Sequence, residues 1–221
     1  QKLLSETRIT DSLGHLSIVK LDETGLPVSE IDPLGGMTVF EYDEVGRTSA
    51  VVDPDGHRTQ YQYDEHGNLL KLTRPDEHSI QYEYNEAGKP VRITAPNGAT
   101  WQQQWDDHGL LVQSQSPLGA VDSYSYDAHG QLTQYINPRK AITRLEYDSR
   151  GNLMQFTNAK NQTTRFKYDA PGNLLEQTDP LGYSTRYAYD RKGRLLRADL
   201  SDGTAIQCSY DAEDNLVRYV D

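Results

Sequence analysis

The stretch Tyr63-Asp64-Glu65-His66-Gly67-Asn68-Leu69 decides how the chain folds, because it recurs every 21 residues. One period later it returns as Tyr84-Asn85-Glu86-Ala87-Gly88, and the same slot holds an aromatic residue, without insertion, in the other strong copies: Tyr42, Trp105, Tyr126, Tyr147, Tyr168, Tyr189 and Tyr210. A fixed period of this size is typical of repeat architectures. We therefore predict that residues 1–221 form one continuous array of about ten repeats and are a fragment of a longer protein.

Each repeat contains two turn signals. The first is Tyr-Asp-x-x-Gly-Asn, in which eight of nine strong copies carry the Gly and Asp214 replaces it in the last. Such a position requires a positive φ, and the Asp side chain bonds backbone N–H groups further along the turn. The second signal is Asp-Pro-x-Gly, as in Asp53-Pro54-Asp55-Gly56, whose residue order matches a type I turn.

Two short strands connect the turns in every repeat. Thr59-Gln60-Tyr61-Gln62-Tyr63 alternates polar and aromatic residues, and Leu69-Leu70-Lys71-Leu72-Thr73 follows the turn. No segment has the period of an amphipathic helix. We predict an all-β fold, in which β-hairpins with a 21-residue period build a curved or spiralling antiparallel sheet. Whether Leu69, or Leu70 together with Leu72, shares a face with the tyrosines depends on loop parity and stays open.

Composition and charge limit the classes of function. Apolar residues make up 35% of the chain, which predicts an amphipathic sheet without a thick core. The net charge of −11 argues against a nucleic-acid partner, and most of it comes from the turn aspartates. No apolar run is long enough for a membrane span, and no signal peptide is visible in the sequence. The single Cys208 rules out an internal disulfide framework and is expected to be a half-buried strand residue.

The recurring residues are interpreted as structural positions. The predicted positions combine the aromatic residue, the aspartate and the glycine of the first turn: Tyr42, Asp43, Gly46, Tyr63, Asp64, Gly67, Tyr126, Asp127, Gly130, Tyr147, Asp148, Gly151, Tyr168, Asp169, Gly172, Tyr189, Asp190 and Gly193. A catalytic carboxylate pair is needed once rather than in every repeat, so turn capping is favoured over acid–base chemistry and over calcium binding. His66, His108 and His129 share a slot that also accepts Val45 and Ala87, which favours a solvent position over a metal site. We predict no enzymatic activity, no cofactor and no metal.

These motifs resemble the YD repeats of the Rhs (rearrangement hot spot) family. The family pattern is close to Tyr-Asp-x-x-Gly-Asn-Leu, Asp-Pro-x-Gly and Thr-x-Tyr-x-Tyr-Asp, and residues 168–190 reproduce it almost completely. The resemblance implies a section of a hollow β-shell, as in bacterial polymorphic toxins, Tc toxin complexes and teneurin-like proteins. It also implies that the partners are a C-terminal toxin domain of the same chain and further repeats. Localisation would be secreted or cell-surface in bacteria, with type VI secretion as one route.

One motif of the family is not transferred to this chain. The autoproteolytic Asp-Pro-x-Gly-Leu sequence that releases the cargo is approached only by Asp32-Pro33-Leu34-Gly35-Gly36, which we interpret as a regular turn. The alternative function is a carbohydrate-binding β-repeat module at the cell surface. Trp101 and Trp105 are interpreted as packing variants rather than a sugar platform, and a cell-surface glycan stays a possible partner.

Overall fold

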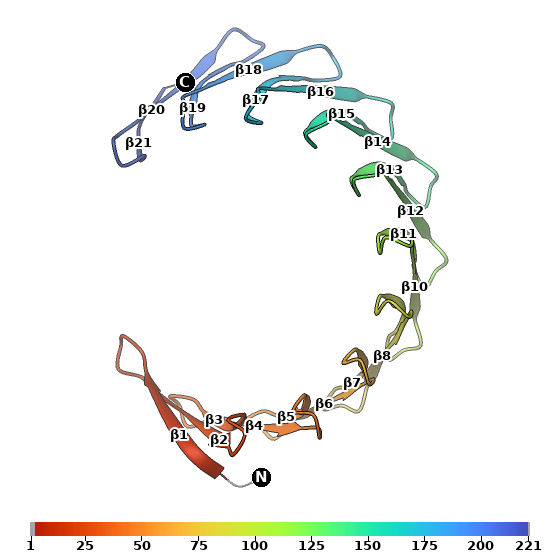
Figure 1. Cartoon of the computed structure of the whole chain (residues 1–221), viewed down its shortest axis with the longest axis vertical. Coiled ribbons are helices and arrows are strands. Elements are labelled where there is room, and N and C mark those ends of the chain that lie inside the picture. Colours follow the sequence, from red (N-terminus) through yellow and green to blue (C-terminus); the bar gives the residue numbers. More distant parts are fainter. Residues whose placement is uncertain (1–2, 221) are drawn as a thin grey trace. The chain divides into compact units, whose positions relative to one another are not determined.

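The computed structural model describes residues 3–220, which form 21 β-strands and no helix. The predicted all-β antiparallel fold is confirmed. No helix of the described part could therefore span a membrane. The chain divides into two compact units, one up to Gly109 together with Gln115–Gly119, the other Leu110–Ser114 together with Ala120 onwards. Figure 1 shows the strands following one another in chain order.

The strands are of two kinds. Those that lead into a first turn are β2 (Leu16–Asp22), β4 (Met37–Tyr42), β6 (Arg58–Tyr63), β8 (Ser79–Tyr84), β10 (Thr100–Trp105), β12 (Val121–Tyr126), β14 (Ile142–Tyr147), β16 (Thr163–Tyr168), β18 (Ser184–Tyr189) and β20 (Ala205–Tyr210). Those that lead into a second turn are β1 (Leu3–Thr10), β3 (Pro27–Ile31), β5 (Thr48–Val52), β7 (Leu69–Thr73), β9 (Pro90–Thr94), β11 (Leu111–Gln115), β13 (Leu132–Ile136), β15 (Leu153–Thr157), β17 (Leu174–Thr178) and β19 (Leu195–Asp199). The last strand, β21 (Leu216–Val220), follows a first turn and pairs with β20.

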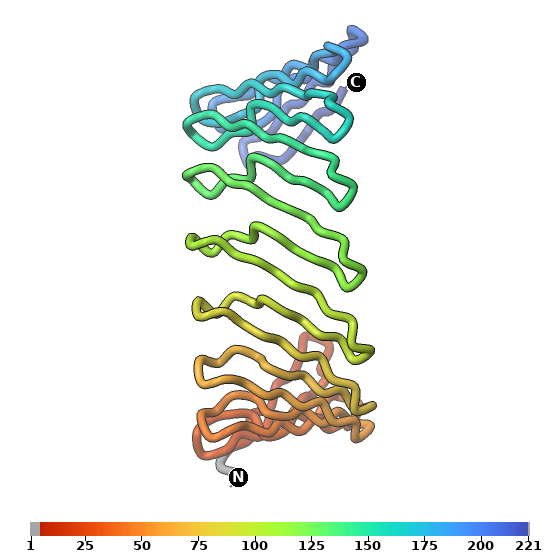
Figure 2. Tube along the Cα trace, turned by 90° about the vertical axis from the view of Figure 1, so that its right-hand side faces the viewer, coloured from red at the N-terminus to blue at the C-terminus, as the bar shows by residue number. Residues whose placement is uncertain are grey.

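Within each unit, every strand pairs antiparallel with its neighbours in sequence. In the first unit this holds from β1 to β10, and in the second from β12 to β21. Figure 2 shows the resulting ladder of hairpins, with turns along both edges. Contacts are therefore local in sequence, as expected of a one-dimensional array.

A β-bulge follows the first turn in every repeat for which the pairing of the two flanking strands is described, and it settles the face of the strand-two leucines. Tyr61 lies opposite Leu72 and Tyr63 opposite Leu69, with the register shift between Gln62 and Tyr63. Leu70 is the extra residue, and its side chain is 39% exposed. Both Leu69 and Leu72 thus lie opposite tyrosines, because the bulge absorbs the one-residue difference that loop parity alone left open.

The sheet has little core. Among the side chains whose burial is described, only Asp22, Ser29, Ala50 and Ala198 are buried. We call the side that carries Tyr61 and Tyr63 the tyrosine face, and the side that carries Gln60 and Gln62 the polar face. Half-buried tyrosines alternate with exposed polar residues in β6 and β8. Stability must come from cross-strand neighbours and from the turns, since no thick apolar layer is present.

Candidate functional site: the tyrosine–aspartate turns

The first turn is closed by its own backbone. In the turn after β6, the Asp64 N–H donates to the Asn68 carbonyl at 3.0 Å, and the Gly67 N–H donates to the Asp64 carbonyl at 3.2 Å. Gly67 has a φ of 89°, a left-handed conformation that glycine adopts without strain. The glycines at the other predicted positions, Gly46, Gly130, Gly151, Gly172 and Gly193, have φ between 80° and 100°.

The aspartate side chain completes the turn. Asp64 Oδ1 accepts the backbone N–H groups of His66 at 2.9 Å and Asn68 at 2.8 Å, and Oδ2 accepts the Asn68 side-chain amide at 2.8 Å. The bond from the Asn68 side chain is the main reason why the pKa of Asp64 lies below its ordinary value. Asp127, Asp148, Asp169 and Asp190 hold their turns in the same way. Because both oxygens are engaged by neighbours, this carboxylate is poorly placed to move a proton.

The tyrosine before the aspartate connects one hairpin to the previous one. The Tyr84 hydroxyl donates to the Leu69 carbonyl at 2.9 Å, and the Tyr147 hydroxyl donates to the Leu132 carbonyl at 3.0 Å. The same bond, always 15 residues back in sequence, is made by Tyr42, Tyr126 and Tyr210. The accepting carbonyl lies at the bulge, where the sheet ladder is interrupted, so the hydroxyl satisfies an acceptor that the strand pairing leaves free.

Trp105 shows what this position requires. Its indole N–H donates to the Pro90 carbonyl at 2.7 Å, in place of the tyrosine hydroxyl. The slot holds Tyr or Trp in all nine strong copies and never Phe, whereas the slot two residues earlier accepts Phe40, Leu145 and Phe166. The requirement is therefore for a ring that carries a hydrogen-bond donor. Sequence inspection predicted the aromatic residue but missed the donor, although the absence of Phe is the signal that could have revealed it.

The residue after the glycine also links successive turns. Arg47 donates to the Asp64 carbonyl of the next turn at 2.7 Å, and its guanidinium lies 4.9 Å from the centre of the Tyr63 ring. Gln131 likewise donates to the Gly151 carbonyl at 3.1 Å. No sequence pattern indicated this link, since the slot holds Arg, Asn, Lys, Leu and Gln in different repeats.

Asp214 shows how a turn without glycine is held. It has a φ of 69°, a conformation that most residues avoid. Its carboxylate accepts bonds from Lys192 at 2.7 Å and from Arg194 at 2.5 Å, both in the preceding repeat. These ion pairs offset part of the backbone strain, and they explain why an acidic residue stands in this slot.

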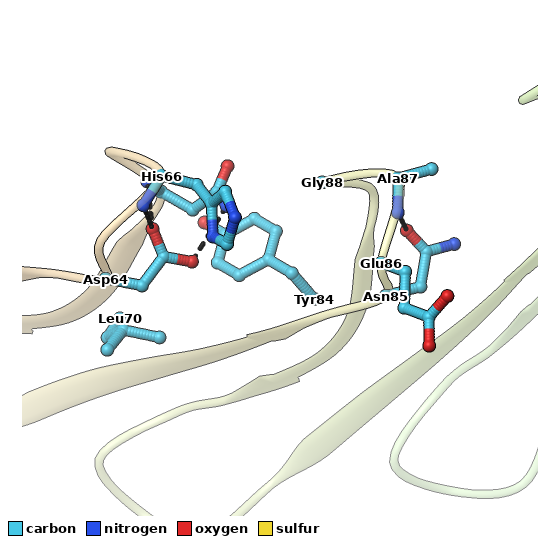
Figure 3. A pocket seen from close by; sticks show the side chains of 9 residues that line it. Asp64, His66, Leu70, Tyr84, Asn85, Glu86, Ala87 and Gly88 are labelled. Carbon is cyan, nitrogen blue, oxygen red and sulfur yellow. Dashed lines mark hydrogen bonds between the residues drawn. The ribbon is translucent and has the colours of Figure 1, made fainter.

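Consecutive first turns enclose a shallow groove. The one in Figure 3 has a volume of about 420 Å³ and lies between the turns after β6 and β8, where it is lined among others by Asp64, His66, Leu70, Tyr84 and Glu86. Figure 3 shows Asp64 and Asn85 on the two sides of this space, each bonded within its own turn. The groove follows from the spacing of the repeats, and the Asp64 and Asn85 side chains that line it are bonded to their own turns.

The predicted histidine and cysteine positions fall where the sequence placed them. His66, His108 and His129 are exposed, and Cys208 is half-buried in β20, opposite Tyr219. In the described part, the residues whose ligand atoms come together as a metal could require are Asp53, Asp55 and His57, within 4.8 Å of one another in a second turn. Asp53 already accepts the backbone N–H groups of Asp55 and His57 and faces the His57 ring at 3.0 Å. Asp53 therefore caps the second turn in the way that Asp64 caps the first turn.

A one-dimensional array of hairpins defines a β-repeat protein when an aspartate or asparagine caps the first turns and, in six of the nine strong copies, a tyrosine or tryptophan donates to the preceding hairpin. The chain belongs to the RHS Repeat family, whose profile matches residues 22–57, 42–79, 66–100, 84–121, 105–142 and 168–205. Together these segments cover more than half of the chain. No curated protein compared with the chain matches it.

Solved structures show the same fold. The crystal structure of TcdB2-TccC3-TEV has a TM-score of 0.72 and 22% identity over 93% of this chain. Those of TcdB2-TccC3 and TcdB2-TccC3-Cdc42 have TM-scores of 0.65 and 0.63 and 20% identity, each over 97% of this chain. The matches span only 13% to 14% of the solved chains, so the likeness concerns the repeat fold rather than a whole protein.

Proposed function

We propose that the chain is a section of the wall of a β-shell that encloses a toxin domain located C-terminally in the same protein. The observation that carries the proposal is a sheet of RHS repeats without a thick core, in which only four described side chains are buried. A sheet of this kind provides extended surface at little cost in chain length, which suits a wall better than a catalytic domain. The similarity to TcdB2-TccC3 structures supports the same role.

As part of such a wall, the chain has a structural, non-catalytic role, and its partners are further repeats and the enclosed domain. The 221 residues act as one continuous array within a longer protein, which fits the 13% to 14% of the solved chains that the matches cover. Secretion from bacteria or display at the cell surface follows from the proposed delivery of the enclosed domain.

Limited proteolysis of the full-length protein tests the proposal. We expect the C-terminal domain to resist protease while the array is intact. In a variant carrying Gly130→Val and Gly151→Val, which strains two turns, the domain should become accessible. The matched control changes two exposed histidines in the slot before the turn glycine, His108→Val and His129→Val, because Val45 already occupies that slot. Equal cleavage of the domain in the unmodified protein and in the glycine variant contradicts enclosure.

Carbohydrate binding is the second candidate function, and one observation favours it. Trp101 is 39% exposed on the tyrosine face, opposite Ile93, where a sugar ring could stack. A glycan array probed with the chain and with Trp101→Thr tests this role, since Thr59 and Thr143 occupy the same slot in other repeats. Binding that the substitution abolishes would support a lectin-like module.

A further inference from the structure

The polar face of the second unit carries an unusual set of cations. One slot of the repeat holds Gln60, Gln81 and Gln102 in the first unit, but Arg144, Arg165 and Arg186 in three successive repeats of the second. All three arginines are exposed. Because glutamine fills the slot in the same strands of other repeats, the fold does not require a cation there. We call these three residues the arginine row.

The arginine row lies on one side of the sheet. Arg144 lies opposite Gln134, Arg165 opposite Gln155 and Arg186 opposite Glu176. Along each strand, these polar-face residues alternate with residues of the tyrosine face. Successive arginines are two strands apart, about 10 Å across the sheet. Lys167 and Arg197 add two more exposed cations to the same face.

The carboxylates on the polar face from β14 to β19 are too few to balance its cations. Glu176 is only 16% exposed, because Lys167 at 2.6 Å and Arg186 at 2.9 Å cover it. Asp199 is bound by Arg197 at 2.6 Å, and Glu146 accepts the Gln155 amide at 2.9 Å. Arg144 and Arg165 make no ion pair within residues 3–220. From β14 to β19 this face therefore holds five cations against three largely engaged carboxylates.

The positive charge of the polar face from β14 to β19 is opposite in sign to the net charge of the other described residues. In residues 3–220 the strands hold 11 Lys or Arg and nine Asp or Glu, a net of +2, whereas the turns hold 10 and 23, a net of −13. A dense polyanion that reached the arginine row would pass close to the acidic turns and be repelled within a Debye length of about 8–10 Å. A polypeptide with a few spaced carboxylates meets less repulsion, and arginine pairs with carboxylates in a two-pronged geometry.

We propose that the arginine row is a docking surface for an acidic polypeptide segment, which lies across β14–β19 on the polar face and places carboxylates on Arg144, Arg165 and Arg186. The amide and hydroxyl side chains between the arginines, among them Gln134 and Thr178, supply partners for its peptide groups. This surface does not depend on which face of the proposed shell is enclosed, and its test is independent of the protease experiment above.

Fluorescence anisotropy with a labelled oligo-glutamate peptide tests the proposal on the whole chain. The variant Arg144→Gln, Arg165→Gln, Arg186→Gln installs the residue that the first unit uses in this slot, so its fold should be unchanged by circular dichroism and thermal unfolding. Three exposed charge pairs of this kind correspond to about tenfold weaker binding. Affinity should also fall as salt rises.

The control separates the arginine row from net charge. The variant Arg139→Gln, Lys160→Gln, Arg191→Gln removes three exposed cations from turns of the same unit and lowers the net charge by the same amount. It should bind the peptide about as well as the unmodified chain. Equal weakening by both variants, or no binding of the peptide at low salt, overturns the proposal. Tighter binding of heparin or single-stranded DNA than of the peptide also overturns it, because the surface would then serve another class of macromolecule.

Discussion

At the scale of the residue, the turn glycine is the position least open to substitution. Gly130 has a φ of 80°, and a Cβ added there would lie 3.7 Å from the side chain of Leu110, so the obstacle is backbone strain rather than space. Gly130→Val should destabilise the chain by about 1–3 kcal/mol. The measurement is the midpoint of urea unfolding.

His129→Val is the matched control, because the preceding residue has an ordinary turn conformation and Val45 stands in the same slot. Its effect should stay within about 0.5 kcal/mol. Gln131→Val would be a poor control, because Gln131 is a half-buried turn residue whose side chain donates to the Gly151 carbonyl at 3.1 Å. Equal midpoints for the two variants would contradict the role assigned to the glycine.

The tyrosine hydroxyl gives a second prediction. Tyr147→Phe removes the donor to the Leu132 carbonyl at the bulge and leaves that acceptor without its partner, at an expected cost of about 1–2 kcal/mol. Tyr187→Phe is the control, because Phe166 and Phe40 occupy its slot, and it should be nearly neutral. Thermal unfolding of the two variants side by side measures the difference, and a neutral Tyr147→Phe would remove the hydroxyl from the account of repeat stability.

The turn aspartates predict how stability depends on pH. The pKa of Asp148 is held below 3.8, first by the hydrogen bond from the Asn152 side chain and then by that from its backbone. The folded state therefore favours the ionised carboxylate, so its contribution is present above about pH 4 and is lost as pH falls through the folded-state pKa. Urea midpoints at pH 6 and pH 3 should differ less in Asp148→Asn than in the unmodified chain. Asn85 shows that the amide keeps the turn, with bonds from Ala87 and Lys89. An equal difference in both chains would exclude this linkage.

At the scale of the element, the unit is the whole 21-residue repeat. Deletion of residues 148–168 joins Tyr147 to Asp169 and restores the motif, so the shortened chain should keep its β spectrum and a cooperative transition. Deletion of residues 148–167, one residue fewer, leaves two tyrosines in succession and shifts the strand by one residue. Such a shift moves the half-buried side chains to the opposite face.

Circular dichroism and denaturant unfolding distinguish the two deletions. The register-breaking deletion should give a broader transition at lower denaturant. Indistinguishable transitions would mean that the strands tolerate a slip and that the bulge does not fix the register.

The hairpins could be predicted from the sequence because they depend on local chemistry. The positions of Tyr63, Asp64 and Gly67, and the strands on either side, follow from turn residues and period-2 alternation. The face of Leu69 could not be predicted, because the bulge at Leu70 breaks the alternation on which the prediction rests. The bond from Arg47 to the next turn was likewise out of reach, since it joins residues that only the paired sheet brings together.

At the scale of the whole molecule, charge is separated by location. The turns carry a net of −13 within residues 3–220, whereas the strands are close to neutral. Like charges on successive turns repel one another, and salt screens this repulsion. The unfolding temperature should therefore rise between about 10 mM and about 150 mM salt, as scanning calorimetry can measure. A fall would mean that the ion pairs, such as that between Lys167 and Glu176, outweigh the repulsion between turns.

The backward reach of the tyrosine has a consequence for synthesis on the ribosome. Leu69 emerges 15 residues before Tyr84, so the carbonyl at its bulge stays uncapped until the following strand has left the exit tunnel. A hairpin whose bulge carbonyl is bonded in this way is completed only by its successor, whereas donors such as Arg47 are already present when the turn that they bond is made. At such a repeat the growing end holds an unfinished hairpin, whatever the number of repeats already made.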